Sequence, residues 1–184
     1  SFPEAKIHFV INKEIAPLYK DHPDIDRVIT FSDRENHGLT YIKKVHELMK
    51  STHYDAIIDM RSTLKTLFFS LFSLSTPYRI GRKKWYGQTL LNYRLETPEG
   101  IDRVQSNLHL MEPLAVEGKI IKDEHFPLYI SDTEKAAYQD YLRSKGLDLT
   151  KPVILVAVAT RIAGKAWPRE RMLEILHRII DNYH

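Results

Sequence analysis

The chain has 184 residues, of which 43% are hydrophobic and 28% carry a charge, a composition typical of a folded globular protein rather than a disordered tail. It contains no cysteine, which excludes a disulfide scaffold and a thiolate metal site and fits a reducing cytosol. The formal net charge of +3 suits anionic ligands but falls far short of the dense basic stripe that binding to duplex DNA needs.

Short apolar or β-branched runs alternate with helical patterns along the chain. In chain order, the sequence predicts strands at 6–11 and 27–31, a helix at 39–50, a strand at 55–60, a helix at 63–74, a strand at 78–81, helices at 102–116 and 133–145, a strand at 152–159 and a helix at 168–183. The strands are almost continuously apolar, as in a parallel sheet that helices cover on both faces. This alternation predicts a doubly wound, Rossmann-like α/β fold.

The helical segments carry their own signals. The apolar stripe expected on the first helix consists of Leu39, Ile42, Val45, Leu48 and Met49. The helix at 133–145 is expected to begin at an Asp132 cap and to end at Gly146. The most apolar stretch, 67–74, is far shorter than the ~20 residues that span a bilayer. We interpret it as a core helix, with contact to a membrane surface as the alternative.

The last part of the chain predicts a second domain. Residues 126–150 lead into one strand and one helix, which together cannot bury their own apolar faces. We therefore expect a first domain over 1–125, a connection over 126–150 and the start of a second domain over 151–184. The first strand also begins abruptly, so we expect truncation at both ends. Exposed apolar edges of this kind predict that the chain self-associates.

The sharpest local motif lies between the last predicted strand and the last predicted helix. Thr160, Arg161 and Lys165 follow the carboxyl end of that strand, where parallel sheets bind phosphate groups. We predict that these three residues bind a diphosphate; solvated loop cations are the alternative. The segment also nearly spells a P-loop, but Ala159 replaces the first glycine and Ala166 replaces the magnesium-binding hydroxyl. A P-loop phosphotransferase therefore stays an alternative.

A second group of cations follows the third and fourth predicted strands. It consists of Arg61, Lys65, Arg79 and Arg82, with further lysines and aromatic residues at 83–86. Because the carboxyl ends of parallel strands meet at one edge, these side chains can form a pocket for a phosphorylated or carboxylated acceptor. A solvated basic rim is the alternative. No RNP-like strand accompanies them, so no nucleic-acid partner is expected.

Other catalytic patterns are missing from the sequence. It has no His-Glu-x-x-His pair for zinc and no Gly-x-Ser-x-Gly elbow for a hydrolase triad. We therefore predict no metal site. Asp55 and Asp59 flank the third predicted strand and are interpreted as structural.

Residues 165–168 (KAWP) resemble the Lys-x-Trp-Pro motif of bacterial lipopolysaccharide heptosyltransferases, the ADP-heptose glycosyltransferase family with the GT-B fold. Further segments that resemble this family in order and spacing are 2–7, 22–29, 54–59 followed by Lys65, 78–81 and 104–108. The resemblance covers nearly the whole chain, and the shared order of the motifs is more specific than any one of them.

The resemblance implies two Rossmann-like domains that face a cleft. Residues 1–125 would be the domain on the side of the acceptor, an anionic Kdo-containing lipopolysaccharide inner core, and 151–184 would begin the domain that binds an ADP-sugar. The implied reaction is an inverting transfer of a hexosyl or heptosyl group without metal or cofactor. It would take place in the cytoplasm, with peripheral contact to the cytoplasmic face of the inner membrane. Lys165 matches the family's phosphate-contacting lysine, Thr160 a nearby hydroxyl donor, and Lys65 a lysine on the acceptor side.

Two family motifs are not found in these 184 residues. The Gly-Asp motif that carries the catalytic aspartate would precede residue 1, and an Asp-x-Gly-x-x-His motif would follow residue 184. The catalytic base is therefore expected outside the chain, which alone would be inactive although its intact parent is a glycosyltransferase. A non-catalytic anion-binding module is the remaining alternative.

Overall fold

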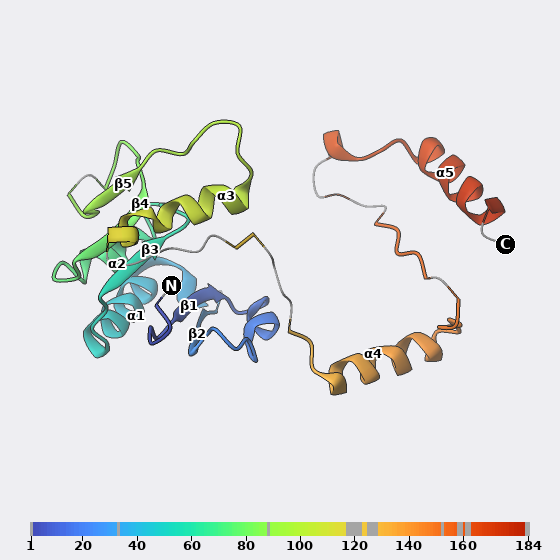
Figure 1. The fold of residues 1–184 in the computed structure, drawn as a ribbon, viewed down its shortest axis with the longest axis horizontal. Coiled ribbons are helices and arrows are strands. Elements are labelled where there is room, and N and C mark those ends of the chain that lie inside the picture. The colour runs from blue at the N-terminus through green and yellow to red at the C-terminus, as the bar shows by residue number, and fades with distance from the viewer. Residues whose placement is uncertain are drawn as a thin grey trace. The chain divides into compact units, whose positions relative to one another are not determined.

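The computed structural model describes residues 2–32, 34–87, 89–116, 123–124, 129–151, 153–157, 160 and 163–182. The chain divides into two compact units, unit 1 (Ser1–Tyr129) and unit 2 (Ile130–His184). All of the described strands belong to unit 1, whereas the described part of unit 2 consists of helices and segments without regular structure (Figure 1). The sheets that could position a site therefore lie in unit 1.

Parallel strand pairs form the frame of unit 1. The strands are β1 (His8–Asn12), β2 (Arg27–Phe31), β3 (Ala56–Asp59), β4 (Tyr78–Arg82) and β5 (Tyr93–Leu95). One sheet pairs β1 with β2, and a second has the order β3-β4-β5, with all pairs parallel. Because the strands of each sheet run the same way, their carboxyl ends meet at one edge, where α/β proteins bind ligands.

Helices connect and cover these strands. Unit 1 contains η1 (Ala16–Tyr19), η2 (Arg34–Asn36), α1 (Gly38–Ser51), α2 (Leu67–Leu71), α3 (Arg103–Leu108) and η3 (His109–Val116). The described part of unit 2 contains α4 (Asp132–Ser144), η4 (Ala163–Lys165) and α5 (Arg169–Asn182). In unit 1, α1 packs against α2 and η2, and η3 packs against β4 and β5 (Figure 1). The connection β3–α2–β4 is thus a βαβ unit, as parallel pairing requires.

The larger core cluster joins β2 to one face of α1. Its buried members are Ile29, Phe31, Tyr41, Val45 and Met49. The three helix residues, Tyr41, Val45 and Met49, are spaced four apart and form one row on α1. The sequence had predicted Leu39 in this buried stripe, but Tyr41 is there instead. These two positions lie about 200° apart around a helix. Only one of them can face the core, and Leu39 is left 83% exposed.

A smaller core cluster packs η3 against the second sheet. Ile80 and Leu110 are fully buried there, with Leu114 beside them. The sequence predicted one helix over 102–116, but the α-helix ends at Leu108 and continues as a 3-10 helix. Pro113 explains the change, because it lacks an N–H and its ring would clash with the carbonyl four residues earlier in an α-helix.

Unit 2 confirms the predicted helices and corrects two details. Ser131, not Asp132, caps α4, through a capping box in which its hydroxyl accepts from the Glu134 N–H. Gly146 ends the helix as predicted, with a φ of +82°.

The segment 153–157, which belongs to the strand predicted at 152–159, is not a strand, and its side chains are exposed. A strand needs hydrogen bonds to a neighbouring strand, and the described part of unit 2 contains no other strand.

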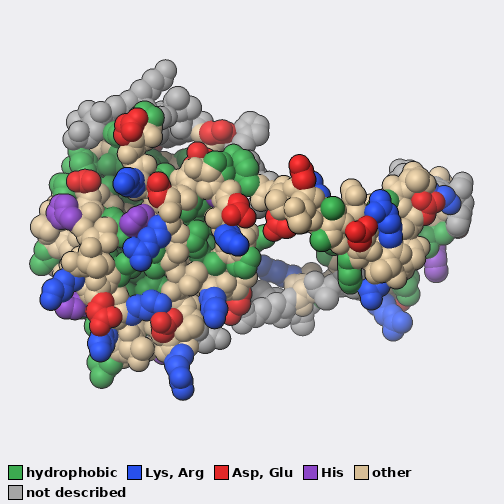
Figure 2. Space-filling model, turned by 90° about the horizontal axis from the view of Figure 1, so that it is seen from below, with side chains coloured by type: hydrophobic (Ala, Val, Ile, Leu, Met, Phe, Trp, Pro, Cys, Tyr) green, Lys and Arg blue, Asp and Glu red, His purple; other side chains and the backbone are tan. Residues whose placement is uncertain are grey.

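Charged side chains are spread over the surface. On the face in Figure 2, the Lys and Arg side chains of unit 1 are interspersed with Asp and Glu and form no continuous basic stripe. Several of these charges form exposed ion pairs, such as Lys43 with Glu47 at 3.9 Å. Exposed pairs of this kind contribute about 0–1 kcal/mol each, so the two core clusters and the buried polar groups hold the fold.

Candidate functional site

The loop after β3 is organised by a buried carboxylate. Asp59 Oδ1 accepts from the N–H groups of Arg61 at 3.1 Å and Ser62 at 2.7 Å, and its Oδ2 accepts from the Thr66 hydroxyl at 2.6 Å. Burial raises the pKa of Asp59, while these hydrogen bonds and the charge of Arg61 act in the opposite direction. Both carboxylate oxygens of Asp59 thus bind groups of the loop after β3. This agrees with the interpretation of Asp59 as a structural residue.

Ser62 joins this loop to the end of β4. Its φ of +47° is in the left-handed region, a costly conformation for a residue other than glycine. Four hydrogen bonds hold it there. Its N–H donates to Asp59 Oδ1 at 2.7 Å, its hydroxyl donates to the Asp59 carbonyl at 2.8 Å and accepts from the Arg82 N–H at 2.7 Å, and its carbonyl accepts from the Tyr86 hydroxyl at 3.0 Å. No sequence pattern indicated a role for Ser62. Its role is to connect the loop after β3 to Arg82 and Tyr86, which lie far from it in the sequence.

Gly81 allows this close approach of the loop to β4. A Cβ at position 81 would lie 2.9 Å from Leu91 Cδ1 and 3.0 Å from Ser62 Oγ, both in a buried region. The Gly81→Ala substitution is expected to lower the free energy of unfolding by about 1–3 kcal/mol through overpacking. Urea denaturation measures this difference. The matched control is Gly164→Ala, where no atom lies within 4 Å of the added Cβ, and an equal loss in both variants would contradict the packing argument.

The structure brings Arg61 and Lys65 together at the carboxyl end of β3. The Lys65 ammonium donates to the carbonyl and side-chain oxygens of Asn36 and lies 4.5 Å from the centroid of the Tyr41 ring. Burial lowers the pKa of Lys65, and the nearby positive charge of Arg61 lowers it further. Arg61 itself is exposed. An ammonium group has three donor hydrogens, so Lys65 keeps one beyond the two that Asn36 accepts.

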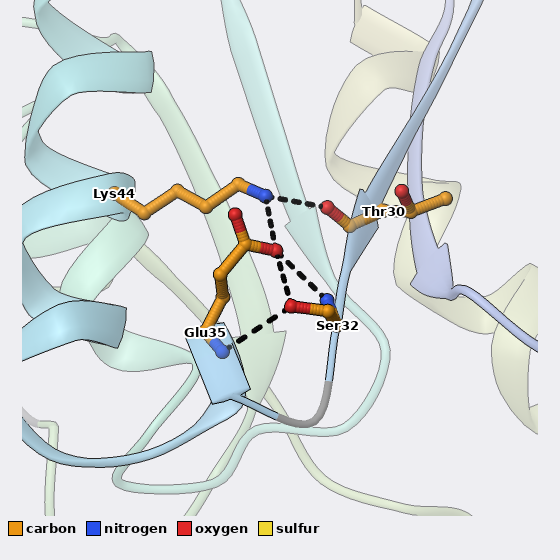
Figure 3. Close-up of polar contacts among 4 residues, drawn as sticks. All are labelled: Thr30, Ser32, Glu35 and Lys44. Carbon is orange, nitrogen blue, oxygen red and sulfur yellow. Dashed lines mark hydrogen bonds and ion pairs between the residues drawn. The ribbon is translucent and has the colours of Figure 1, made fainter.

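The Asn36 that holds Lys65 belongs to a turn fixed by ionic contacts. The Ser32 N–H and hydroxyl donate to Glu35 Oε2 at 2.9 and 2.7 Å, and Lys44 of α1 bonds the same carboxylate at 2.9 Å (Figure 3). Lys44 also donates to the Thr30 carbonyl at 2.8 Å. These contacts fix η2 between the end of β2 and α1, and so they fix the oxygens that bind Lys65.

This turn predicts a pH dependence of stability. The hydrogen bond from Lys44 and those from Ser32 lower the pKa of Glu35 from 4.5 to about 2. A carboxyl whose pKa is depressed by folding stabilises the protein above its ordinary value, and that contribution is lost as the pH falls towards the folded value. Glu35→Gln is therefore expected to be less stable than the unaltered protein above pH 4.5, with a difference that narrows as the pH approaches 2.

Urea unfolding of both proteins between neutral pH and pH 2 tests this expectation. Glu47→Gln, which removes an exposed carboxylate from the outer face of α1, is the matched control. A stability difference for Glu35→Gln that stayed constant over the whole range would show that the Glu35 carboxylate does not titrate with folding.

The two arginines of β4, Arg79 and Arg82, are both buried within unit 1. Arg79 is buried and donates to the backbone carbonyls of Leu74, Thr76 and Leu90, which closes the loops on both sides of its strand. Its observed contacts are thus with the protein's own backbone. A role for Arg79 in binding an anionic acceptor stays a prediction.

Arg82 connects three segments at the carboxyl end of the second sheet. Its guanidinium donates to the Ser106 hydroxyl at 2.6 Å and to Asn107 Oδ1 at 2.8 Å, both on α3, and more weakly to the Met60 carbonyl at 3.4 Å and the Thr97 hydroxyl at 3.5 Å. Burial lowers the pKa of Arg82. The predicted acceptor role of Arg82 likewise stays a prediction; its contacts fix the loop that carries Arg61 relative to α3.

The predicted phosphate-binding residues belong to unit 2. Thr160 is exposed, Arg161 lies outside the described residues, and Lys165 is the exposed last residue of η4. The following helix α5 begins at Arg169, and its first turn includes a bond from the Met172 N–H to the Pro168 carbonyl at 3.1 Å. In a P-loop the helix starts at the motif lysine itself. A helix that starts beyond Pro168 is therefore a poor match to the P-loop interpretation.

Two comparisons with known proteins give a match, one to a family model and one to a solved structure. The family model described as glycosyltransferase family 9 (heptosyltransferase) matches residues 42–183. A crystal structure of a family 9 glycosyl transferase from Veillonella parvula is similar to the chain, with a TM-score of 0.80 at 16% sequence identity. The match covers 99% of this chain and 52% of that one, so the chain spans about half the length of the solved protein. A comparison with curated proteins gives no match.

The structural likeness confirms the predicted fold class, a parallel-sheet α/β architecture of the GT-B type. None of the described helices is long and apolar enough to cross a membrane. The family match extends over more than half of the sequence and includes both the Asp59 loop and Lys165. The chain therefore belongs to glycosyltransferase family 9, the heptosyltransferase family.

Proposed function

We propose that the protein carrying this chain transfers a heptose-type sugar from an ADP-sugar to an anionic lipopolysaccharide inner-core acceptor. The family match over residues 42–183 is the observation that carries the proposal. The reaction inverts the anomeric centre and uses no metal ion. It takes place in the cytoplasm, at or near the inner face of the membrane where lipid-linked acceptors are found.

Unit 1 supplies the acceptor side in this proposal. Arg61 is exposed at the carboxyl end of β3, and the ammonium of Lys65 is held beside it by Asn36 and Tyr41. Two positive groups at the ligand-binding edge of a parallel sheet suit a carboxylated or phosphorylated sugar. Arg79 and Arg82 contribute through the loops that they hold, with Arg82 nearest to the Arg61 loop through its bond to the Met60 carbonyl.

Unit 2 supplies the donor side. Lys165 is the exposed last residue of η4, which precedes α5, and Thr160 is exposed before η4. Together with Arg161 they contact the diphosphate of the ADP-sugar. When the glycosidic bond to the diphosphate breaks, negative charge grows on the departing ADP, and a nearby ammonium stabilises that charge more than the ground state. A carboxylate deprotonates the acceptor hydroxyl in this proposal, as the family resemblance implies.

Calorimetric titration with ADP, in EDTA and again with magnesium, tests the donor side of the proposal. The expected result is weak binding by the chain that is the same in both buffers and is lost in Lys165→Ala. Binding of ATP that appears only with magnesium would overturn it in favour of a P-loop phosphotransferase. Binding of phosphorylated glycans with no detectable affinity for ADP would favour an anion-binding module.

A further inference from the structure

The Lys65 ammonium is held by an asparagine from a different element of unit 1. Asn36, the last residue of η2, accepts from Lys65 through its main-chain carbonyl and through Oδ1, although the two residues are 29 positions apart in the sequence. The Tyr41 ring lies 4.5 Å from the same ammonium, and the Tyr41 hydroxyl donates to the Lys65 carbonyl at 3.0 Å. Both the backbone and the side chain of Lys65 are thus fixed, which removes much of the rotamer freedom of a long side chain.

The surroundings of Lys65 oppose its positive charge. Burial lowers the pKa of Lys65, and the positive charge of Arg61 lowers it further. The phenol of Tyr41 is neutral, because burial raises its pKa to about 12. The Asp59 carboxylate accepts from groups of its own loop, and no carboxylate of the described residues pairs with Lys65. The two oxygens of Asn36 are therefore the contacts that favour the charged form of Lys65.

These two oxygens are neutral, although a carboxylate lies one residue away. Glu35 accepts from Ser32 and pairs with Lys44 of α1 at 2.9 Å, so its charge is directed away from Lys65 (Figure 3). The same contacts hold η2, and with it Asn36, between β2 and α1. A carboxylate at the place of the Asn36 amide would cancel most of the charge on Lys65, whereas amide oxygens bind the ammonium and leave its charge available to a ligand.

We propose that Asn36 is a positioning residue for the acceptor, which holds the Lys65 ammonium at the carboxyl end of β3 with its charge uncompensated and one N–H left for an acidic group of the sugar. The inference rests on the proposed function, because it takes the anionic acceptor to lie at this edge of the sheet. Lys65 contacts the acceptor, and Asn36 acts through Lys65. An amide suits this task because it accepts hydrogen bonds without adding a charge.

Two substitutions at position 36 separate this role from a merely structural one. In the protein that carries residues 1–184, Asn36→Ala is expected to raise the acceptor KM about tenfold with little change in kcat. It should also move the alkaline fall of kcat/KM for the acceptor to lower pH, because the charged form of Lys65 loses a hydrogen bond. Asn36→Asp should move that fall to higher pH and still leave the KM raised, because the new carboxylate stabilises the ammonium but cancels its charge.

The matched control is Asn92→Ala. Asn92 has an exposed side chain in unit 1 and precedes β5 at the amino edge of the second sheet, away from the carboxyl ends of the strands. This variant should leave both the acceptor KM and the pH profile unchanged. An equal rise of KM in Asn36→Ala and Asn92→Ala would overturn the positioning role.

Carbon-13 NMR of the lysine side chains gives the pKa of Lys65 without an assay of transfer. The Lys65 Cε signal is assigned by its loss in Lys65→Arg. Its pKa should fall in Asn36→Ala and rise in Asn36→Asp, and a pKa that either substitution leaves unchanged would overturn the proposal. Transfer with the same KM and pH profile in Asn36→Ala as in the unaltered protein would refute the positioning role and leave the proposed function standing. The expected pKa changes in a protein that transfers no sugar would refute the proposed function and leave the link between Asn36 and Lys65 standing.

Discussion

Replacing Lys165 with alanine is expected to reduce kcat/KM for sugar transfer by about 100-fold in the protein that carries residues 1–184. Lys165 is the exposed last residue of η4, four residues before α5 begins, and is the proposed contact to the diphosphate of the donor. In the proposed reaction the charge on the departing ADP develops mostly in the transition state, so the loss should fall mainly on kcat, with a smaller change in the KM for the donor.

Steady-state kinetics with an ADP-sugar and a Kdo-containing acceptor measure this effect. Lys151→Ala is the matched control, because Lys151 is also an exposed lysine of unit 2. Thermal unfolding of both variants shows whether either substitution disturbs the fold. A Lys165→Ala enzyme with unchanged kcat would contradict the phosphate role that the Lys-x-Trp-Pro resemblance implies.

Arg82→Ala is expected to lower the free energy of unfolding by roughly 2–4 kcal/mol. The substitution removes the donors to Ser106, Asn107 and Met60 and leaves these acceptors in a largely buried region. It also removes the aliphatic stem of a side chain that is only 5% exposed. Because those partners belong to α3 and to the Asp59 loop, the variant should loosen both segments together.

Urea denaturation measures the stability of Arg82→Ala, and hydrogen exchange shows which segments open. Arg94→Ala, which removes an exposed arginine from the adjacent strand β5, should change the stability by less than about 0.5 kcal/mol. Arg82→Lys should recover only part of the loss, since an ammonium cannot reproduce the planar array of donors. Equal, small effects in Arg82→Ala and Arg94→Ala would mean that the hydrogen bonds to α3 add no net stability.

Periodicity predicted the regular elements where one pattern dominates. The strand predicted at 27–31 coincides with β2, and the helix predicted at 39–50 differs from α1 by one residue at each end. The hydrophobic pattern was less informative where contacts between distant segments determine the secondary structure. The β5 strand has three residues and exists through its pairing with β4, so nothing in its own sequence reveals it. Pro113 similarly turned a predicted α-helix into a 3-10 helix.

In the candidate site, too, the sequence predicted what depends on neighbouring residues and missed what depends on residues far apart in the chain. The sequence was enough to place Arg61 and Lys65 near each other, because both follow β3 and lie four residues apart. The sequence did not show that Arg82 would turn inward to Ser106, or that Ser62 would take a left-handed conformation. Both involve a partner at least 20 residues away in the sequence, which spacing along the chain cannot indicate.

Sugar transfer by the protein that carries residues 1–184 tests the central proposal most directly. The protein would be offered ADP-heptose and a Kdo-terminated lipid A acceptor in the presence of EDTA, with UDP- and GDP-sugars in parallel, and the products would be identified by mass spectrometry. The proposal predicts one heptose added per acceptor from ADP-heptose without metal. Transfer from another nucleotide sugar alone, or turnover that requires magnesium, would contradict it.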